Sequence, residues 1–411
     1  MKYGLLGERL SHSYSCELHR LLGSAPYELC EKKPEELPSF FREKNFAGIN
    51  VTIPYKEAVI PFLDEISEKA REIGAVNTIV NREGKLSGYN TDFAGMRALL
   101  QKIGVSLSGK KVMILGSGGT SKTARAVAES LGAASVVTVS RQGKNGVSYE
   151  EAVRAHRDAQ TLLNTTPAGM TPRVEGQAVS LAPFTKLEAV ADAVYNPLRT
   201  DLVLEAEARG IPSEGGLYML TAQAVYASAL FRGTEPKPGD IDRIYRTLRD
   251  QKRNIVLIGM PSCGKTSVGQ LLSQKTGMAF FDSDDRVRER IGMNIAEFFA
   301  RYGEEAFRNV ESEILSELSL TSGSILATGG GAVLRQENVR ALKRNGILVF
   351  LDRSPENLIA TDDRPLSADR DSLLSLYHKR YETYLSAADL RIPADSSLTE
   401  VAESVWKEVR K

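Results

Sequence analysis

The sequence has few cysteines and histidines and no long apolar run, and each absence excludes a class of protein. Its three cysteines, Cys16, Cys30 and Cys263, form no C-x-x-C pair, and its four histidines make no metal cluster. We therefore expect a reducing, cytoplasmic protein. The chain has no apolar signal core at its start and no run of about 18 apolar residues, the length that a membrane-spanning helix needs. Nothing in it predicts membrane targeting.

An excess of charge of either sign is also missing. Lys and Arg number 53 and Asp and Glu 52, which leaves a net charge of +1. No global field would recruit nucleic acid or an acidic membrane surface, so we expect small-molecule partners. The oligomeric state stays open. The hydrophobic content of 42% is ample for buried cores, and 411 residues predict two or three domains.

A phosphate-binding pattern follows an apolar run at residues 254–258, in the stretch NIVLIGMPSCGKTS. Gly259, Gly264, Lys265 and Thr266 fill every fixed position of the pattern, between a predicted strand and a predicted helix. In such a loop the backbone N–H groups face the phosphates, the lysine reaches the outer phosphates and the hydroxyl holds Mg²⁺. The alternative is a glycine-rich turn without a ligand, which the strand–helix context disfavours.

A second glycine-rich turn, 116–119, lies between a predicted strand at 112–115 and a helix predicted from Thr123 onward. This arrangement is typical of dinucleotide binding, with Ser121 as a tolerated small residue in place of the third glycine. After the next strand, Arg141 stands where an NAD enzyme carries an acidic residue, and Lys144 could support it. A guanidinium suits a 2′-phosphate, so NADP is favoured over NAD. The alternative is an exposed arginine.

Residues 1–100 alternate short apolar runs with helical segments and place polar groups at their junctions. Ser13 and Ser15 precede a helix, Lys56 follows a strand that Pro54 stops, and Asp92 precedes another helix. Strand ends are where α/β sheets bind ligands, but helix capping and a solvated lysine explain the same residues.

The fold class is α/β throughout. We predict a substrate-binding domain at 1–100 that helix 214–232 completes, and a Rossmann domain at 101–213. A linker at 233–251 carries a short amphipathic helix expected to pack between the halves, and a phosphate-loop domain of the nucleoside-monophosphate-kinase type spans 252–411. In that domain three predicted strands end in polar or glycine residues on the face of the loop.

The motifs SHSYS, NVTIPYK, GAVNTIV, NTDFAG, GSGGTS and GLYMLTAQA occur in this order, and over nearly its whole length the first half resembles shikimate dehydrogenase. The second half resembles shikimate kinase through its phosphate loop, DSD, GEEAFR, ATGGGAV, RPL and RYETY. The whole is similar to a fusion of two enzymes of aromatic amino acid biosynthesis, the product of the first being the substrate of the second. Two alternatives remain: quinate and another small polyol as substrates, or a ligand-sensing regulator.

The resemblance implies roles for residues of the first half. Lys56 and Asp92 would be the catalytic pair that reduces 3-dehydroshikimate with NADPH. The substrate carboxylate would be bound by Ser13 and Ser15, and its hydroxyls by Thr52, Asn77 and Gln223. NADP would be bound by Gly116, Ser117, Gly118, Gly119, Thr120, Ser121, Ser140, Arg141, Lys144, Tyr195 and Gly216.

For the second half the resemblance implies phosphorylation of shikimate by ATP with Mg²⁺. Asp284 would be the base, with Lys265 and Arg364 stabilising the transferred phosphoryl group and Thr266 and Asp282 holding the metal. ATP would be bound by Gly259, Pro261, Ser262, Cys263, Gly264, Lys265, Thr266, Ser267 and Arg364. Shikimate would be bound by Asp284, Arg308, Gly329, Gly330, Gly331 and Arg380.

Three positions depart from the family patterns or invite a second interpretation. Ser140-Arg141-Gln142 replaces the usual Asn-Arg-Thr, and Asp362 and Asp363 stand in the predicted lid, 362–367, where basic residues are common. An additional arginine contact to ATP is therefore not expected. Cys263 near a helix N-terminus indicates either oxidative sensitivity or only a small residue that fills the loop.

Overall fold

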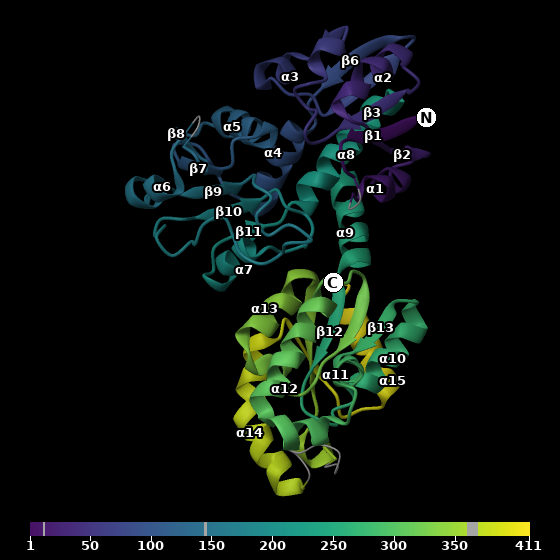
Figure 1. Cartoon of the computed structure of the whole chain (residues 1–411), viewed down its shortest axis with the longest axis vertical. Helices are drawn as coiled ribbons and strands as arrows, with labels where there is room; N and C mark the ends of the chain where they lie inside the picture. Colours follow the sequence, from purple (N-terminus) through teal and green to yellow (C-terminus); the bar gives the residue numbers. More distant parts are fainter. Residues whose placement is uncertain (11–12, 144–145, 360–368) are drawn as a thin grey trace. The chain divides into compact units, whose positions relative to one another are not determined.

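The computed structural model describes residues 1–10, 13–143, 146–359 and 369–411, which form two compact units, Met1–Leu248 and Arg249–Lys411 (Figure 1). Lys144 and Arg364, both predicted site residues, lie outside the described residues, as does the predicted lid. No helix in the described part of the chain is both long enough and apolar enough to cross a membrane.

The first unit begins with a mixed six-stranded sheet in the order β2-β1-β3-β5-β6-β4. Its central strands β1 and β3 are buried along their whole length, in keeping with sequences that are apolar apart from Asn50. The strands are β1 (Tyr3–Gly7), β2 (Tyr27–Glu31), β3 (Gly48–Val51), β4 (Glu65–Ile66), β5 (Thr78–Arg82) and β6 (Lys85–Tyr89). The helices are α1 (Ser15–Leu21), α2 (Leu37–Glu43), α3 (Glu68–Ile73) and α4 (Asp92–Ile103), with the 3₁₀ turns η1 (Pro34–Glu36) and η2 (Ile60–Phe62).

The second sheet of this unit is parallel, in the order β11-β10-β9-β7-β8. Its strands are β7 (Lys111–Leu115), β8 (Ser135–Val139), β9 (Thr161–Asn164), β10 (Ala189–Asp192) and β11 (Ser213–Glu214). The helices that follow are α5 (Gly119–Ser130), α6 (Tyr149–Ala155), α7 (Asp201–Ala208) and α8 (Leu217–Arg232). Helix α8 returns to the first sheet, where it packs against α1, α4 and β5.

The second unit is one parallel sheet in the order β13-β14-β12-β15-β16, with helices α12 and α13 on one side and α10 and α15 on the other (Figure 1). Its strands are β12 (Asn254–Ile258), β13 (Ala279–Asp282), β14 (Ser324–Ala327), β15 (Gly346–Asp352) and β16 (Leu390–Pro393). Its helices are α10 (Lys265–Thr276), α11 (Ser283–Ile291), α12 (Ile295–Ser319), α13 (Gln336–Asn345), α14 (Arg370–Ala387) and α15 (Leu398–Glu408), with η3 (Ala332–Leu334) and η4 (Pro355–Asn357). Strands β13, β14 and β15 run parallel to β12 in this sheet, so their carboxyl ends meet at the edge that bears the phosphate loop, as predicted.

Helix α9 (Asp240–Lys252) is the amphipathic helix predicted to pack between the halves, and its first-unit contacts can be described. Its buried side chains Ile244, Tyr245 and Leu248 belong to a hydrophobic cluster of the first unit. Tyr245 donates a hydrogen bond to Glu214 at 3.2 Å, which ties the helix to the end of the second sheet. The helix is part of the first unit because its apolar stripe finds its partners there.

Truncation of α9 should destabilise the first unit. Each of its three buried side chains stabilises the fold by about 1.5 to 3 kcal/mol. We expect a fragment of residues 1–238 to melt at least about 10 °C below a fragment of residues 1–250. Thermal unfolding followed by circular dichroism measures this difference. Equal melting temperatures would show that α9 adds nothing to the first unit.

Candidate active sites

The first candidate site is built around an ion pair between Lys56 and Asp92. Lys56 lies in the turn after β3, and Asp92 is the first residue of α4. The Lys56 Nζ is 2.6 Å from Asp92 Oδ2, and the two side chains are only 15% and 9% exposed. The N-terminus of α4 favours a negative charge at Asp92. An ammonium group is therefore held in one orientation at the carboxyl edge of the first sheet.

A chain of buried hydrogen bonds lies beside this pair. The Asn77 side chain accepts from the Thr91 N–H at 2.7 Å and donates to the Thr91 hydroxyl at 3.0 Å. The Thr91 hydroxyl in turn donates to Gln223 Oε1 at 3.5 Å, while the Gln223 amide is held by the Leu220 carbonyl at 3.0 Å. Asn77 and Gln223, both predicted to bind substrate hydroxyls, are thus brought together next to Asp92.

The two predicted carboxylate-binding serines lie at the start of α1. The Ser13 hydroxyl donates to Ser15 Oγ at 3.0 Å, and Ser15 is buried as the first residue of the helix. Thr52, predicted to bind a substrate hydroxyl, follows β3 and donates its N–H to the Leu6 carbonyl at 2.9 Å. The three side chains line the same carboxyl edge of the sheet as Lys56. Among the described residues we find no hydrogen bond between either serine and Thr52. Their shared role in binding the substrate stays a prediction.

The structure also shows a buried aromatic and amide group that the sequence analysis missed. The His19 ring stacks on Tyr27 with 4.0 Å between ring centroids, and burial lowers the pKa of His19 to about 3. The Tyr27 hydroxyl donates to Asn50 Oδ1 at 2.9 Å, and the Asn50 amide donates to Thr78 at 3.0 Å. A polar residue in the fully buried strand β3, such as Asn50, is the sequence signal that could have found this group.

The predicted dinucleotide turn lies directly against Lys56. A side-chain carbon at Gly119 would sit 3.7 Å from Lys56 Cδ, whereas one at Gly118 would meet no atom within 4 Å. Gly116 has a φ of +111° and no room for a side chain, since a Cβ would lie 2.6 Å from Thr165 Oγ1. The open space at Gly118 and the helix N-terminus fit a dinucleotide phosphate. Helix α5 begins at Gly119, four residues earlier than predicted, because glycine cap residues carried no side-chain signal.

The structure supports the other predicted NADP-binding residues less directly. Ser140 is buried and Arg141 exposed, and no contact of Arg141 with the 116–121 turn is recorded for the described residues. The Tyr195 ring lies 5.2 Å from that of Tyr14, while Gly216 packs so closely on β10 that a Cβ would be 2.2 Å from the Ala193 carbonyl oxygen. The packing requires glycine at position 216 without any ligand. Direct cofactor contacts of these residues stay predictions.

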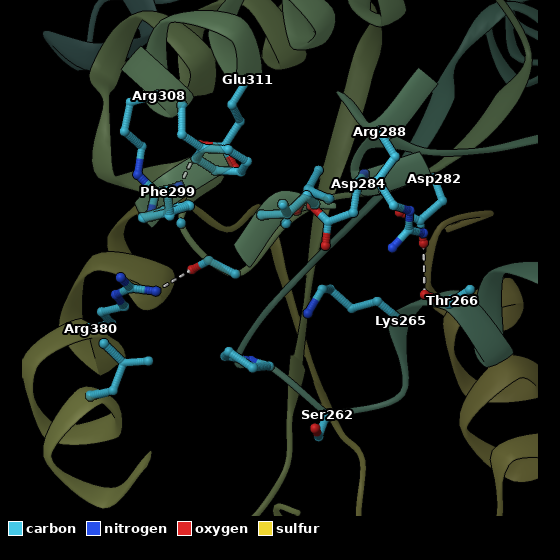
Figure 2. A pocket seen from close by; sticks show the side chains of 18 of the residues that line it. Ser262, Lys265, Thr266, Asp282, Asp284, Arg288, Phe299, Arg308, Glu311 and Arg380 are labelled. Atoms are coloured by element: carbon cyan, nitrogen blue, oxygen red, sulfur yellow. Dashed lines mark hydrogen bonds and ion pairs between the residues drawn. The ribbon is translucent and has the colours of Figure 1, made fainter. Parts of the chain in front are cut away.

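The second candidate site is a cavity of about 420 Å³ at the carboxyl edge of the third sheet (Figure 2). It collects the predicted residues from the phosphate loop, α11, α12, the glycine turn after β14, and α14. Of the kinase site residues that were predicted and that the structure describes, only Gly259 and Cys263 do not line it. Those that do are Pro261, Ser262, Gly264, Lys265, Thr266, Ser267, Asp282, Asp284, Arg308, Gly329, Gly330, Gly331 and Arg380.

The phosphate loop has the geometry that its pattern predicts. Ser262 and Gly264 have φ values of +62° and +99°, which curve the backbone around the cavity. The Lys265 ammonium donates to the carbonyl oxygens of Gly259 at 2.9 Å and Met260 at 2.8 Å. The Thr266 hydroxyl donates to Asp282 Oδ2 at 2.7 Å, so a hydroxyl and a carboxylate are already paired where Mg²⁺ would be held.

The Cys263 thiol is buried in the phosphate loop. It is 1% exposed, and its sulfur lies 3.8 Å from the Lys265 ammonium. A side-chain carbon at Gly259 would lie 2.9 Å from the same sulfur. This packing supports the prediction of a small residue that fills the loop.

Arginines and a buried carboxylate form the far end of the cavity. Arg308 Nη1 donates to Glu311 at 2.6 Å and Arg308 Nη2 donates to Glu304 at 3.2 Å, while Arg380 donates to the Gly330 carbonyl at 3.0 Å. Burial raises the pKa of Glu311, and its Oε1 atom has no hydrogen-bond partner. Two guanidinium groups and an unsatisfied buried oxygen are therefore available to bind a polar ligand in this cavity.

The sequence analysis missed Glu311 and Arg288, which also line this cavity. Glu311 follows Arg308 by three residues on α12, and Arg288 follows Asp284 by four on α11, so each pair shares a helix face. Figure 2 shows Arg288 beside Asp282 and Asp284. Helical spacing from an already predicted residue is the signal that would have found both.

The glycine turn is required by contact with the charged residues. A Cβ at Gly329 would lie 2.6 Å from Asp284 Oδ1, and one at Gly331 would lie 2.1 Å from Arg308 Nη1. Neither carbon fits without moving a residue of the site. The backbone of the turn therefore forms one wall of the cavity, in reach of a ligand.

Comparison with known proteins decides the family. The model for the shikimate dehydrogenase substrate binding domain matches residues 5–79. A shikimate dehydrogenase (NADP(+)) of Geobacillus kaustophilus is 38% identical over 265 residues, which are 59% of this chain and 95% of the relative. The chain belongs to the shikimate dehydrogenase family.

The remainder of this family member is a shikimate kinase domain, since the shikimate kinase model matches residues 261–410. Among solved structures, shikimate 5-dehydrogenase of Thermus thermophilus in complex with NADP(H) and shikimate is 31% identical, with a TM-score of 0.53 over 60% of this chain and 99% of that one. A quinate dehydrogenase of Corynebacterium glutamicum in complex with NAD is 28% identical, with a TM-score of 0.54 over 60% and 98%.

Asp192 makes the stability of the dehydrogenase part depend on pH. This fully buried carboxyl at the end of β10 accepts from Thr200 at 2.6 Å and from Asn164 and the Val194 N–H at 2.9 Å. Burial raises its pKa from 3.8 to about 7. The folded state thus keeps a proton that the unfolded chain releases, so its stabilisation is complete below pH 3.8 and is lost as the pH rises through about 7.

We expect Asp192→Asn to remove this pH dependence. An amide keeps one accepting oxygen for Asn164 and Val194, and the Thr200 hydroxyl can rotate to accept from its nitrogen. Between pH 5 and 8 the wild-type free energy of unfolding should therefore fall by about 1 to 3 kcal/mol more than that of the variant. Urea unfolding at both pH values measures the difference. Parallel changes would show that Asp192 does not titrate in this range.

Proposed function

We propose that this chain is a bifunctional enzyme that reduces 3-dehydroshikimate to shikimate with NADPH and then phosphorylates shikimate with ATP to shikimate 3-phosphate. The observation that carries the proposal is that each unit brings its predicted catalytic residues next to its predicted nucleotide-binding loop. In the first unit the Lys56–Asp92 pair lies against the dinucleotide turn, and in the second unit one cavity joins the phosphate loop to Asp284 and two arginines.

In the dehydrogenase reaction Lys56 acts at the carbonyl oxygen. Bound NADPH supplies the hydride to the carbonyl carbon. The Lys56 ammonium polarises the carbonyl and donates the proton that completes the new hydroxyl. Asp92, 2.6 Å from Lys56, orients the ammonium and holds a substrate hydroxyl. Asn77 and Gln223 fix the remaining hydroxyls, and Ser13 and Ser15 bind the carboxylate.

In the kinase reaction the substrate hydroxyl oxygen attacks the terminal phosphorus of ATP, and the bond from that phosphorus to ADP breaks. Asp284 lies in the cavity and accepts the hydroxyl proton. Lys265 must leave the carbonyl oxygens of Gly259 and Met260 to contact the phosphates. Thr266 and Asp282 would hold Mg²⁺, which would neutralise phosphate charge. Arg308 and Arg380 bind the planar carboxylate.

The test is a side-by-side assay of substrates and nucleotides. Purified protein is given shikimate or quinate with NADP⁺ or NAD⁺, and separately shikimate or quinate with ATP and Mg²⁺. The proposal expects the highest kcat/KM for shikimate with NADP⁺ and ATP-dependent phosphorylation of shikimate. A preference for quinate with NAD⁺ would instead support a quinate dehydrogenase like that of Corynebacterium glutamicum.

A further inference from the structure

Tyr384 is buried beneath the glycine turn of the kinase cavity, although it does not line that cavity. It lies on α14 one turn after Arg380, so both side chains face the same way. Its hydroxyl donates to the carbonyl oxygen of Gly330, the same atom to which Arg380 Nη1 donates at 3.0 Å. One backbone carbonyl thus has two donors, one of them a guanidinium with a predicted ligand.

The surroundings of Tyr384 hold its hydroxyl in place. The side chain is 1% exposed, and its ring stacks on Phe350 with 5.2 Å between centroids and 15° between planes. Burial raises the pKa of the Tyr384 phenol, so the group stays neutral and remains a donor. Because the Gly330–Gly331 peptide is planar, a fixed carbonyl also fixes the opposite direction of the Gly331 N–H.

Arg380 would have two alternative hydrogen-bond acceptors in this site, the Gly330 carbonyl and the substrate carboxylate. Before a ligand arrives, its Nη1 donates to Gly330, and it is 6% exposed. A carboxylate bound between Arg308 and Arg380 draws guanidinium N–H groups toward itself. The Gly330 carbonyl oxygen is half-buried, and it is destabilised when it loses its hydrogen-bond donors. Tyr384 is the donor that stays when Arg380 turns.

We propose that Tyr384 is a positioning residue for the substrate carboxylate: its hydroxyl holds the Gly330 carbonyl, which frees Arg380 to bind the carboxylate and keeps the glycine wall in place. This inference rests on the proposed kinase activity and adds a residue to it. Tyr384 contacts no substrate atom in this account and acts through Gly330 and Arg380. It therefore affects the binding of the acceptor and leaves the ATP end of the cavity unchanged.

The test compares Tyr384→Phe with Tyr381→Phe in the full-length chain. Tyr381 is the matched control, because it lies on the same helix, contacts the same Phe350 ring and donates its hydroxyl to Asp352 at 3.3 Å. Tyr384→Phe should raise the KM for shikimate about tenfold, which corresponds to about 1.4 kcal/mol, with the KM for ATP changed less than about twofold. Tyr381→Phe should leave both values close to wild type.

A double-mutant cycle with Arg380→Lys separates positioning from general destabilisation. If Tyr384 acts by freeing Arg380, its removal should cost much less than tenfold in the Arg380→Lys background. Equal losses in both backgrounds, equal shifts of the two KM values, or a Tyr384→Phe protein that behaves like Tyr381→Phe would overturn the inference. A wild-type chain that does not phosphorylate shikimate would instead remove the kinase proposal, and the inference with it.

Discussion

Lys56→Met should lower NADPH-dependent reduction of 3-dehydroshikimate by about 10² to 10⁴-fold while leaving shikimate binding largely intact. Methionine keeps much of the length of the side chain but supplies no proton and no positive charge at the carbonyl oxygen. The side chain is only 15% exposed, so water has limited access to replace the ammonium. Steady-state oxidation of NADPH measures the rate, and calorimetric titration with shikimate measures binding.

Two controls belong to this experiment. Lys69→Met removes an exposed ammonium on α3 that pairs with Glu72 at 2.5 Å, and it should leave the reduction rate unchanged. The kinase rate of the Lys56→Met protein should also equal that of wild type, because Lys56 lies in the other unit. Wild-type reduction by Lys56→Met would remove this lysine from the mechanism.

Asp284→Asn should have the complementary effect and lower the phosphorylation of shikimate by about 10² to 10⁴-fold. The amide has nearly the same shape, so the contact with Gly329 is preserved, but it cannot take the proton of the attacking hydroxyl. ADP formation with saturating shikimate, ATP and Mg²⁺ measures the rate. The KM for ATP should change little, since the phosphate loop is untouched.

Asp285→Asn provides the matched control on the same helix. Asp285 is 57% exposed and does not itself line the cavity, although it pairs with Arg288, which does, so it should be replaceable with little loss of phosphorylation. The dehydrogenase rate of both variants should stay at the wild-type value. If Asp284→Asn and Asp285→Asn lowered the kinase rate equally, the effect would reflect the charge of α11 and not a base at position 284.

Central strands and glycine turns could be predicted from the sequence because local composition determines them. Strand β12 has the predicted bounds and β7 begins one residue before the predicted 112–115, since each is a short, mainly β-branched or aliphatic run between clear breaks. Edge strand β2 was missed, because its sequence YELCE alternates polar and apolar residues weakly and is stabilised by pairing with β1. Such pairing is a property of the folded chain.

The residues of the candidate sites also divide into those that the sequence predicts and those that only the fold reveals. Lys265 was predicted because it stands in a recognisable phosphate-loop pattern, and Lys56 and Asp92 because their motifs resemble those of shikimate dehydrogenase. Glu311 and Tyr384 were missed because their roles depend on contacts with Arg308 and with Gly330 O, which only the fold brings together. The packing of α9 on the first unit also needed the fold, since an apolar stripe does not say which unit covers it.

The most direct test of the central claim is a one-pot conversion with complementing variants. Wild-type protein given 3-dehydroshikimate, NADPH, ATP and Mg²⁺ should produce shikimate 3-phosphate, measured by mass spectrometry. Lys56→Met alone should stop at 3-dehydroshikimate and Asp284→Asn alone at shikimate, and a mixture of the two should restore the final product. Failure of the wild type to make shikimate 3-phosphate from 3-dehydroshikimate would contradict the account.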